Sequence, residues 1–191
     1  MRPKEHRRQV LHLIIGSVFL FLVAAGVAEW WLFFGLLVGA YGLIILGQVS
    51  DLFRLHRFLG WAQRRYDRRD SYLPLWGLLS LIKGFLVATA LFPDGVAVPA
   101  LAVLVYGDAF ATLVGRDAPS PHLPWHPRKT VAGLLGGTAA ATLVLSLFLP
   151  FFPALLASFA GMLVESLPRP QPLLDDNLVI PLASGLVLIL L

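Results

Sequence analysis

The stretch VYGDAFATLVGR, residues 105–116, places an aspartate inside a run of apolar and small residues and ends on an arginine. It belongs to a longer apolar run, 96–114, which is long enough to cross a lipid bilayer as a helix. A carboxylate inside the membrane is costly and by default marks a functional site. Asp108 therefore predicts a functional site within a membrane-spanning helix.

The composition is that of an integral membrane protein. Of the 191 residues, 58% are hydrophobic and 14% are charged, and the mean hydropathy is +0.78, which lies outside the usual range of soluble globular domains. The chain has no cysteine, so it can form no disulfide and no thiolate metal site. The net charge of +4 is explained by basic loops at a membrane surface and requires no nucleic-acid partner.

Apolar runs separated by turn residues or charges predict an all-α bundle of seven membrane-spanning helices that forms a single domain, residues 1–191. A basic stretch, DLFRLHRFLGWAQRRYDRRDS (51–71), separates the second span from the third. Two pairs of glycines, Gly35 with Gly39 and Gly133 with Gly137, have the small-xxx-small spacing that lets two helices approach closely. The predicted spans are 10–28, 31–49, 72–92, 96–114, 130–149, 152–167 and 178–191.

The basic residues predict an orientation for these spans. If the N-terminus is cytoplasmic and the spans alternate, every lysine and arginine except Lys83 lies on the cytoplasmic side, as the positive-inside rule requires. Lys83 falls inside the third span, where its simplest role is to pair with an acid on a neighbouring helix. The small size and the lack of an evident targeting segment favour a multi-pass protein of a bacterial cytoplasmic membrane.

Polar residues from five separate segments gather at the cytoplasmic boundary in this topology. Carboxylates with an amide suit Mg²⁺, whereas basic side chains and a helix N-terminus suit phosphate groups. The pattern predicts a site for phosphoryl or nucleotidyl transfer, which would join a soluble phosphate compound to a lipid. The residues are Arg8, His12, Asp108, Lys129, Thr130, Glu165, Asp175, Asp176 and Asn177.

Most of these residues also have a purely structural interpretation. Basic side chains commonly anchor helix ends, Asp and Asn often cap helices, a histidine is often packed, and small residues usually serve packing. Glu165 is intermediate, because it lies near the end of its span. Arg8 and Lys129 would then be anchors of helix ends, Asp176 and Asn177 helix caps, and His12 a packed histidine. The small residues that would serve packing are Gly107, Thr112 and Gly115.

Two segments, GDAFATLVGR (107–116) and RKTVAGLLGG (128–137), resemble paired signatures of the CTP-dependent polyprenol kinases, a family that includes dolichol kinase, phytol kinase and a CTP-using diacylglycerol kinase. RRQVLH (7–12) resembles the family's N-terminal signature, and ESLP (165–168) with DDNLVIPLASG (175–185) its last one. The matching positions in the first two segments are Gly107, Asp108, Ala109, Ala111, Gly115 and Arg116, then Lys129, Thr130 and Gly133.

The chain departs from the family pattern at two places, which leaves the lipid substrate open. Gln9 stands where a lysine is usual, and Leu134 with Leu135 replaces a small polar residue. CDP-lipid synthesis, as in the related phosphatidate cytidylyltransferases, is the alternative. Those enzymes end in a longer signature that this chain lacks, which favours the kinase. A second alternative is a small membrane transporter without enzymatic activity.

The resemblance implies a kinase that transfers the γ-phosphate of CTP to a polyprenol, phytol or similar prenyl alcohol at the cytoplasmic face of the membrane. It implies that Asp108 and Asp176 bind Mg²⁺, with Asp108 as the catalytic base as the alternative. Catalytic roles are implied for Asp108, Lys129, His12 and Glu165. Nucleotide or phosphate contacts are implied for Arg8, Gly107, Arg116, Lys129, Thr130 and Asn177.

Overall fold

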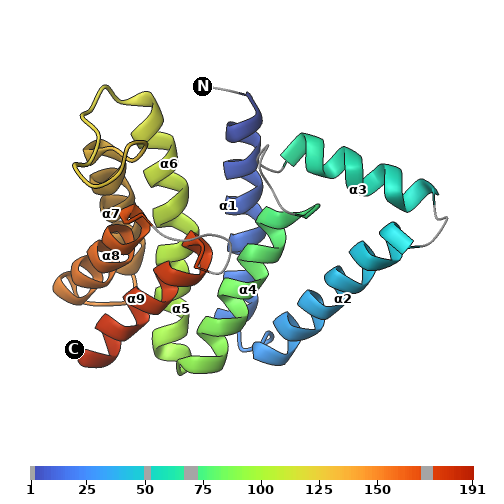
Figure 1. The fold of residues 1–191 in the computed structure, drawn as a ribbon. Coiled ribbons are helices and arrows are strands. Elements are labelled where there is room, and N and C mark those ends of the chain that lie inside the picture. Colours follow the sequence, from blue (N-terminus) through green and yellow to red (C-terminus); the bar gives the residue numbers. More distant parts are fainter. Residues whose placement is uncertain (1–2, 50–52, 67–72, 169–173) are drawn as a thin grey trace.

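The computed structural model describes residues 3–49, 53–66, 73–168 and 174–191. Over these residues the regular secondary structure is helical, apart from one isolated bridge between His122 and Thr130. The predicted all-α class is therefore confirmed for the described residues. In Figure 1 most of the helices run between two ends of the molecule, with the N-terminus at one end and the C-terminus near the other.

Among the described residues, three helical stretches are long and apolar enough to cross a membrane. They correspond to the predicted spans 10–28, 31–49 and 96–114. The first helix begins earlier than predicted, so that Arg8 and His12 both lie on it. The three are α1 (Pro3–Ala24), α2 (Trp30–Val49) and a continuous helix made of α5 (Asp94–Ala102), η1 (Val103–Gly107) and α6 (Asp108–Asp117).

Four shorter apolar helices correspond to the other predicted spans. Each has 15 or 16 residues and so measures about 24 Å at most, against about 30 Å for the hydrocarbon core of a bilayer. Seven crossings and a cytoplasmic N-terminus therefore remain predictions. The four are α4 (Trp76–Leu91), α7 (Val131–Leu145), α8 (Phe151–Ser166) and α9 (Asp176–Leu190).

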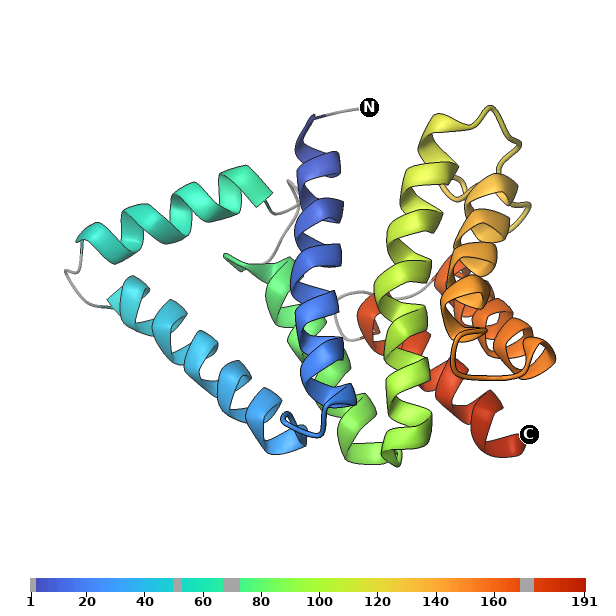
Figure 2. The ribbon, with the colours of Figure 1, turned by 180° about the vertical axis from the view of Figure 1, so that it is seen from behind.

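The basic stretch 51–71 contains a helix that the sequence analysis did not predict. This helix, α3 (Phe53–Tyr66), runs across the direction of α1 near the end of the molecule where the N-terminus lies (Figures 1 and 2). Its residue Leu59 is buried in a small cluster with Ile44 of α2 and Leu79 of α4. The arginines of this stretch mask its apolar face when hydropathy is averaged along the sequence.

The continuous α5–η1–α6 helix is the centre of the fold. In the most apolar stretch of this helix 61% of the residues are buried, whereas in the corresponding stretches of α1 and α2 only 17% are. The helices that pack around it include α1, α7, α8 and α9. A Cβ atom at Gly137 of α7 would lie 2.7 Å from the carbonyl oxygen of Gly107, so this glycine permits the close packing predicted for it. Gly35 and Gly39 of α2 instead face open space.

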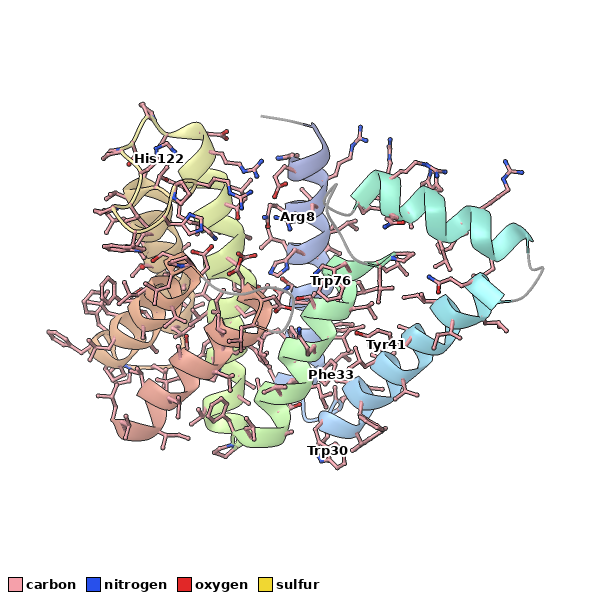
Figure 3. The ribbon with its side chains drawn as sticks, viewed as in Figure 1. Arg8, Trp30, Phe33, Tyr41, Trp76 and His122 are labelled. Carbon is pink, nitrogen blue, oxygen red and sulfur yellow. The ribbon has the colours of Figure 1, made fainter. Side chains whose placement is uncertain are left out.

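Aromatic residues mark one end of the molecule. Trp30, at the start of α2, is half exposed and lies at the opposite end from His122, which follows α6 (Figure 3). Tryptophan is enriched where membrane helices meet the headgroup layer. The two labelled residues therefore indicate the direction along which the long helices would cross the bilayer.

Candidate active site

The central helix changes geometry immediately before Asp108. Val103–Gly107 form a π-helical segment, and Asp108 is the first residue after it. A π segment has i→i+5 hydrogen bonds, which alter the register of the turn that follows, and such segments are frequent at functional sites. Gly107 packs against Met162 of α8, whose Cε would lie 2.8 Å from a Cβ added at Gly107. This glycine lets α8 approach the helix beside Asp108, and its predicted phosphate contact remains a prediction.

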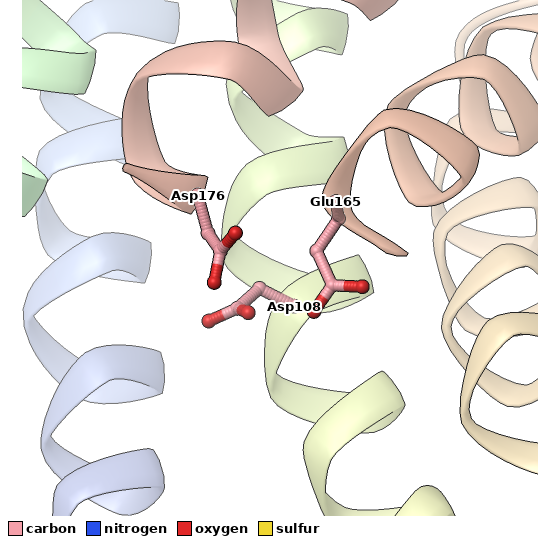
Figure 4. A group of neighbouring side chains, drawn as sticks. All are labelled: Asp108, Glu165 and Asp176. Carbon is pink, nitrogen blue, oxygen red and sulfur yellow. The ribbon is translucent and has the colours of Figure 1, made fainter. Parts of the chain in front are cut away.

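Three carboxylates from three helices meet at this point (Figure 4). They are Asp108 at the start of α6, Glu165 in the last turn of α8 and Asp176 at the start of α9. One oxygen of each lies within 4.8 Å of the others. Carboxylates so close together disfavour one another's ionised form, and a cation beside them relieves this repulsion. The sequence predicted Asp108 and Asp176 as metal ligands, and the structure adds Glu165 to the same cluster.

Lys129 places an ammonium group among these carboxylates. Its Nζ contacts the Glu165 carboxylate and lies 3.7 Å from Oδ2 of Asp176. Burial opposes the charged form of Lys129, but the carboxylates of Glu165, Asp176 and Asp108 outweigh this effect and raise its pKa above the ordinary value. Lys129 is therefore protonated at neutral pH.

The loop between α6 and α7 positions Lys129 through local hydrogen bonds. Nδ1 of His126 accepts from the backbone N–H groups of Arg128 and Lys129, each at 3.1 Å. The indole N–H of Trp125 donates to Oγ of Ser166 at 3.1 Å. Because Ser166 follows the glutamate of the cluster directly, this bond fixes the loop to the end of α8 beside the site.

Thr130 has a structural role in the same region. Its Oγ1 accepts a hydrogen bond from the N–H of Gly133 at 3.1 Å and so caps α7. The same hydroxyl donates to the carbonyl oxygen of Gly115 at 3.1 Å, which connects the end of α6 to the start of α7. The predicted phosphate contact of Thr130 remains a prediction.

The first helix brings basic residues to the other side of Asp108. Nε2 of His12 lies 4.0 Å from Oδ2 of Asp108 and 3.4 Å from the carbonyl oxygen of Leu104. One turn earlier, Nε of Arg8 donates to Glu5 at 3.0 Å, and Nη2 of Arg116 lies 3.5 Å from the other oxygen of Glu5. The sequence did not indicate Glu5, which joins two predicted phosphate-binding arginines from α1 and α6.

An ion pair between α4 and α9 holds the segment that carries Asp176. Nζ of Lys83 lies 2.5 Å from Oδ2 of Asp175, which confirms the prediction that Lys83 pairs with an acid on another helix. Asp175 also accepts a hydrogen bond from the N–H of Leu178 at 3.1 Å and thereby caps α9. Asp175 is thus a capping and pairing residue, whereas its neighbour Asp176 faces the carboxylate cluster.

Asn177 points its amide nitrogen toward α4. Nδ2 donates to Oγ of Ser80 at 2.8 Å, and Gly84 lies so close that a Cβ there would be 2.2 Å from the Asn177 carbonyl oxygen. The side-chain oxygen of Asn177 is buried and accepts no hydrogen bond from the described residues. The predicted nucleotide contact of Asn177 remains a prediction.

Comparison with known proteins finds relatives among plant kinases. The chain is 27% identical to a protein named probable phytol kinase 2 from Glycine max, over 98% of this chain and 66% of the relative. It is 29% identical to farnesol kinase from Arabidopsis thaliana, over 94% of this chain and 63% of the relative. A probable phytol kinase from Zea mays is 30% identical over 62% of this chain and 43% of its own length. The chain spans less than two thirds of the length of these relatives.

No model of a protein family matches the chain, and no solved structure matches it at a significant level. The three relatives are named chloroplastic, so they give no support to the expected bacterial cytoplasmic membrane. None of these names refers to a cytidylyltransferase or a transporter, and the two alternatives derived from the sequence gain no support either.

Proposed function

Because the chain is homologous to the plant phytol and farnesol kinases, we propose that it phosphorylates a prenyl alcohol at the surface of a membrane. The observation that carries this proposal is the cluster of Asp108, Glu165 and Asp176 with the ammonium group of Lys129 beside it. Phosphoryl transfer depends on positioning and on neutralising charge more than on covalent help from the protein. A cluster of this composition supplies both.

The site lies at a depth that suits a lipid alcohol. Asp108 precedes Asp117, the last residue of the central helix, by about two and a half turns. A hydroxyl group of a lipid lies near the membrane surface while its prenyl chain remains among the apolar helices. A soluble nucleotide approaching from the end of α6 would meet the hydroxyl group there. The distribution of basic residues makes this the cytoplasmic side in our proposal.

We propose CTP as the phosphoryl donor, as the sequence resemblance implies. In the reaction the alcohol oxygen forms a bond to the γ-phosphorus, and the bond between that phosphorus and the β,γ-bridging oxygen breaks. The products are a prenyl phosphate and CDP, and the proton of the alcohol passes to a base. His12 takes this role in the proposal, since the carboxylate of Asp108, 4.0 Å away, is placed to stabilise the imidazolium that forms.

The donor atoms of the cluster fit Mg²⁺, a hard cation that binds carboxylate oxygens together with phosphates of the substrate. Asp108, Asp176 and Glu165 would hold the ion, whose bound form would supply charge neutralisation at the phosphate oxygens. Lys129 would contact the phosphates from the same cluster. Arg8 and Arg116, now joined through Glu5, would bind phosphates farther toward the end of α6.

Transfer of labelled phosphate tests this function directly. The purified full chain in lipid nanodiscs is incubated with Mg²⁺, with phytol, farnesol or a longer polyprenol, and with CTP labelled at either the α- or the γ-phosphorus. Label from the γ-position in the lipid product is the expected result, and chelation of Mg²⁺ should stop its appearance. Label from the α-position would show cytidylyl transfer, and no lipid label with any of the alcohols would contradict the kinase. A parallel series with ATP tests the choice of donor.

A further inference from the structure

Helix α3 differs in composition from the apolar helices of the fold. Its 14 residues, Phe53–Tyr66, include four arginines and no acidic residue. A helix this short and this basic cannot cross the hydrocarbon core of a bilayer. Nevertheless it carries large aromatic side chains, so its position relative to the membrane needs a separate explanation.

One face of α3 packs against the rest of the protein. Leu59 and Ala62 are buried, and α3 contacts both α1 and α2. The approach to α2 is close, because a Cβ added at Gly47 would lie 2.6 Å from Cδ1 of Leu59. These contacts hold α3 in a defined position and leave the opposite face uncovered by the described residues.

The uncovered face combines aromatic and basic side chains. Phe58 and Trp61 are 53% and 48% exposed, and their ring centroids lie 6.0 Å apart. Arg57, Arg64 and Arg65 are exposed as well. At 100° per residue these five positions fall within about 120° of the helix circumference. Aromatic and basic residues are therefore interleaved on a single surface.

The direction of α3 places this surface along the membrane plane. In Figures 1 and 2 the helix crosses the direction of α1 and of the central helix, at the end of the molecule where α6 ends. If the long helices span the bilayer, a helix that crosses them at their end lies at the level of the headgroups. Amphipathic helices with basic and aromatic residues bind at that level.

From these observations we infer that α3 is a membrane-surface helix that binds anionic phospholipid headgroups on the side of the bilayer where α6 ends (Figures 1 and 2). Phe58 and Trp61 reach the boundary with the acyl chains, as aromatic residues do in interfacial belts. Arg57, Arg64 and Arg65 bind lipid phosphates through the planar donor groups of their guanidinium ions. The helix thereby fixes the depth of Asp108 beneath the membrane surface.

Fluorescent labels on single cysteines test this position. The chain has no cysteine, so Phe58→Cys provides one unique site for an environment-sensitive dye. In nanodiscs the emission at residue 58 should lie between that of Ile14→Cys, exposed midway along α1, and that of Asp117→Cys, exposed at the end of α6. It should also shift to shorter wavelength when zwitterionic lipid is partly replaced by phosphatidylglycerol. An emission as water-like as at residue 117 in both lipids would overturn the inference.

The arginines are tested separately from the aromatic residues. The triple variant Arg57→Gln, Arg64→Gln and Arg65→Gln should abolish the shift caused by phosphatidylglycerol. Arg7→Gln, on the exposed side of α1, should preserve it. If the triple variant does not fold, the shift in the Phe58→Cys protein should still decrease as salt is raised. A shift that depends on protein concentration in detergent without lipid would instead identify a second copy of the chain as the occupant and overturn the inference. None of these readouts depends on catalysis.

Discussion

Asp108 lies in a group of charges that do not balance. If all three carboxylates are counted as ionised beside the one ammonium group of Lys129, the formal charge of the cluster is −3 + 1 = −2. A residual negative charge in a partly buried site is costly, and a divalent cation neutralises it. This composition is compatible with a divalent cation, and Mg²⁺ binding remains part of the proposal.

Asp108→Asn should abolish phosphate transfer while the protein stays folded. The amide keeps the size of the side chain but removes one of the charges that hold the cation, and we expect the rate to decrease about 100-fold or more. The measurement is the initial rate of transfer of γ-label, together with thermal unfolding in detergent. Asp117→Asn, at the exposed end of the same helix, is the matched control and should retain its rate. Near-normal turnover in Asp108→Asn would remove this residue from the proposed mechanism.

Charged side chains that are costly to place in an apolar helix could be predicted from the sequence, whereas the residues they pair with could not. Asp108 stands out because a carboxylate in an apolar run is expensive wherever the helix lies. Glu165 carried a weaker form of the same signal, since it closes an apolar run. Lys83 and Asp175 lie 92 positions apart, and apolar periodicity does not specify which helices face each other. Their pairing therefore required the structure.

At the scale of helices, the first turn of α9 depends on α4. Lys83→Met should leave Asp175, which is 6% exposed, without its cationic partner. Because Lys83 itself is partly exposed, we expect a loss of about 1–3 kcal/mol, between the values for exposed and buried pairs. The neighbouring Asp176 should be displaced, so phosphate transfer should also decrease. Thermal unfolding and transfer rates measure both effects, and Lys83→Arg is the matched control. An unchanged unfolding temperature in Lys83→Met would show that the ion pair does not hold α9.

Two glycine substitutions of the same type should have opposite effects. Alanine at Gly84 brings a Cβ to 2.2 Å from the backbone oxygen of Asn177, so α9 has to move, at a cost of about 1–3 kcal/mol. Alanine at Gly35 meets no atom within 4 Å and should stabilise the helix by up to about 1 kcal/mol. Unfolding temperatures of the two variants in one detergent provide the measurement. Equal shifts would contradict the close approach of α4 and α9.

The helices missed or misjudged from the sequence have specific physical causes. In α3 the apolar positions Leu55, Leu59 and Ala62 follow helical spacing, but the arginines between them lower the average hydropathy. The π-helical segment has the sequence VLVYG, which is also compatible with an ordinary α-helix. Sequence periodicity identifies a helix and its apolar face, but it does not specify the register change before Asp108, in a segment that contacts α7 and α8.

Considered as a whole, the molecule has two chemically different ends. The N-terminus, α3 and the end of α6 lie at one end (Figures 1 and 2), and Trp30 lies at the other (Figure 3). The chain passes from the first end to the second along α4 and returns along α5–η1–α6. With only 16 residues, α4 is shorter than a usual spanning helix, so its crossing decides the topology.

Cysteine labelling from each side of the membrane tests this crossing. Asp94 and Asp117 are both exposed and begin and end the central helix. If α4 crosses and the N-terminus is cytoplasmic, an impermeant maleimide should reach Asp117→Cys only from the cytoplasmic side and Asp94→Cys only from the opposite side. If the N-terminus is cytoplasmic but α4 does not cross, α1 and α2 alone return the chain to the cytoplasmic side before α5. Asp94→Cys should then be labelled only from the cytoplasmic side and Asp117→Cys only from the opposite side. Labelling of both variants from one side would contradict a spanning central helix, and the absence of native cysteines makes every signal specific.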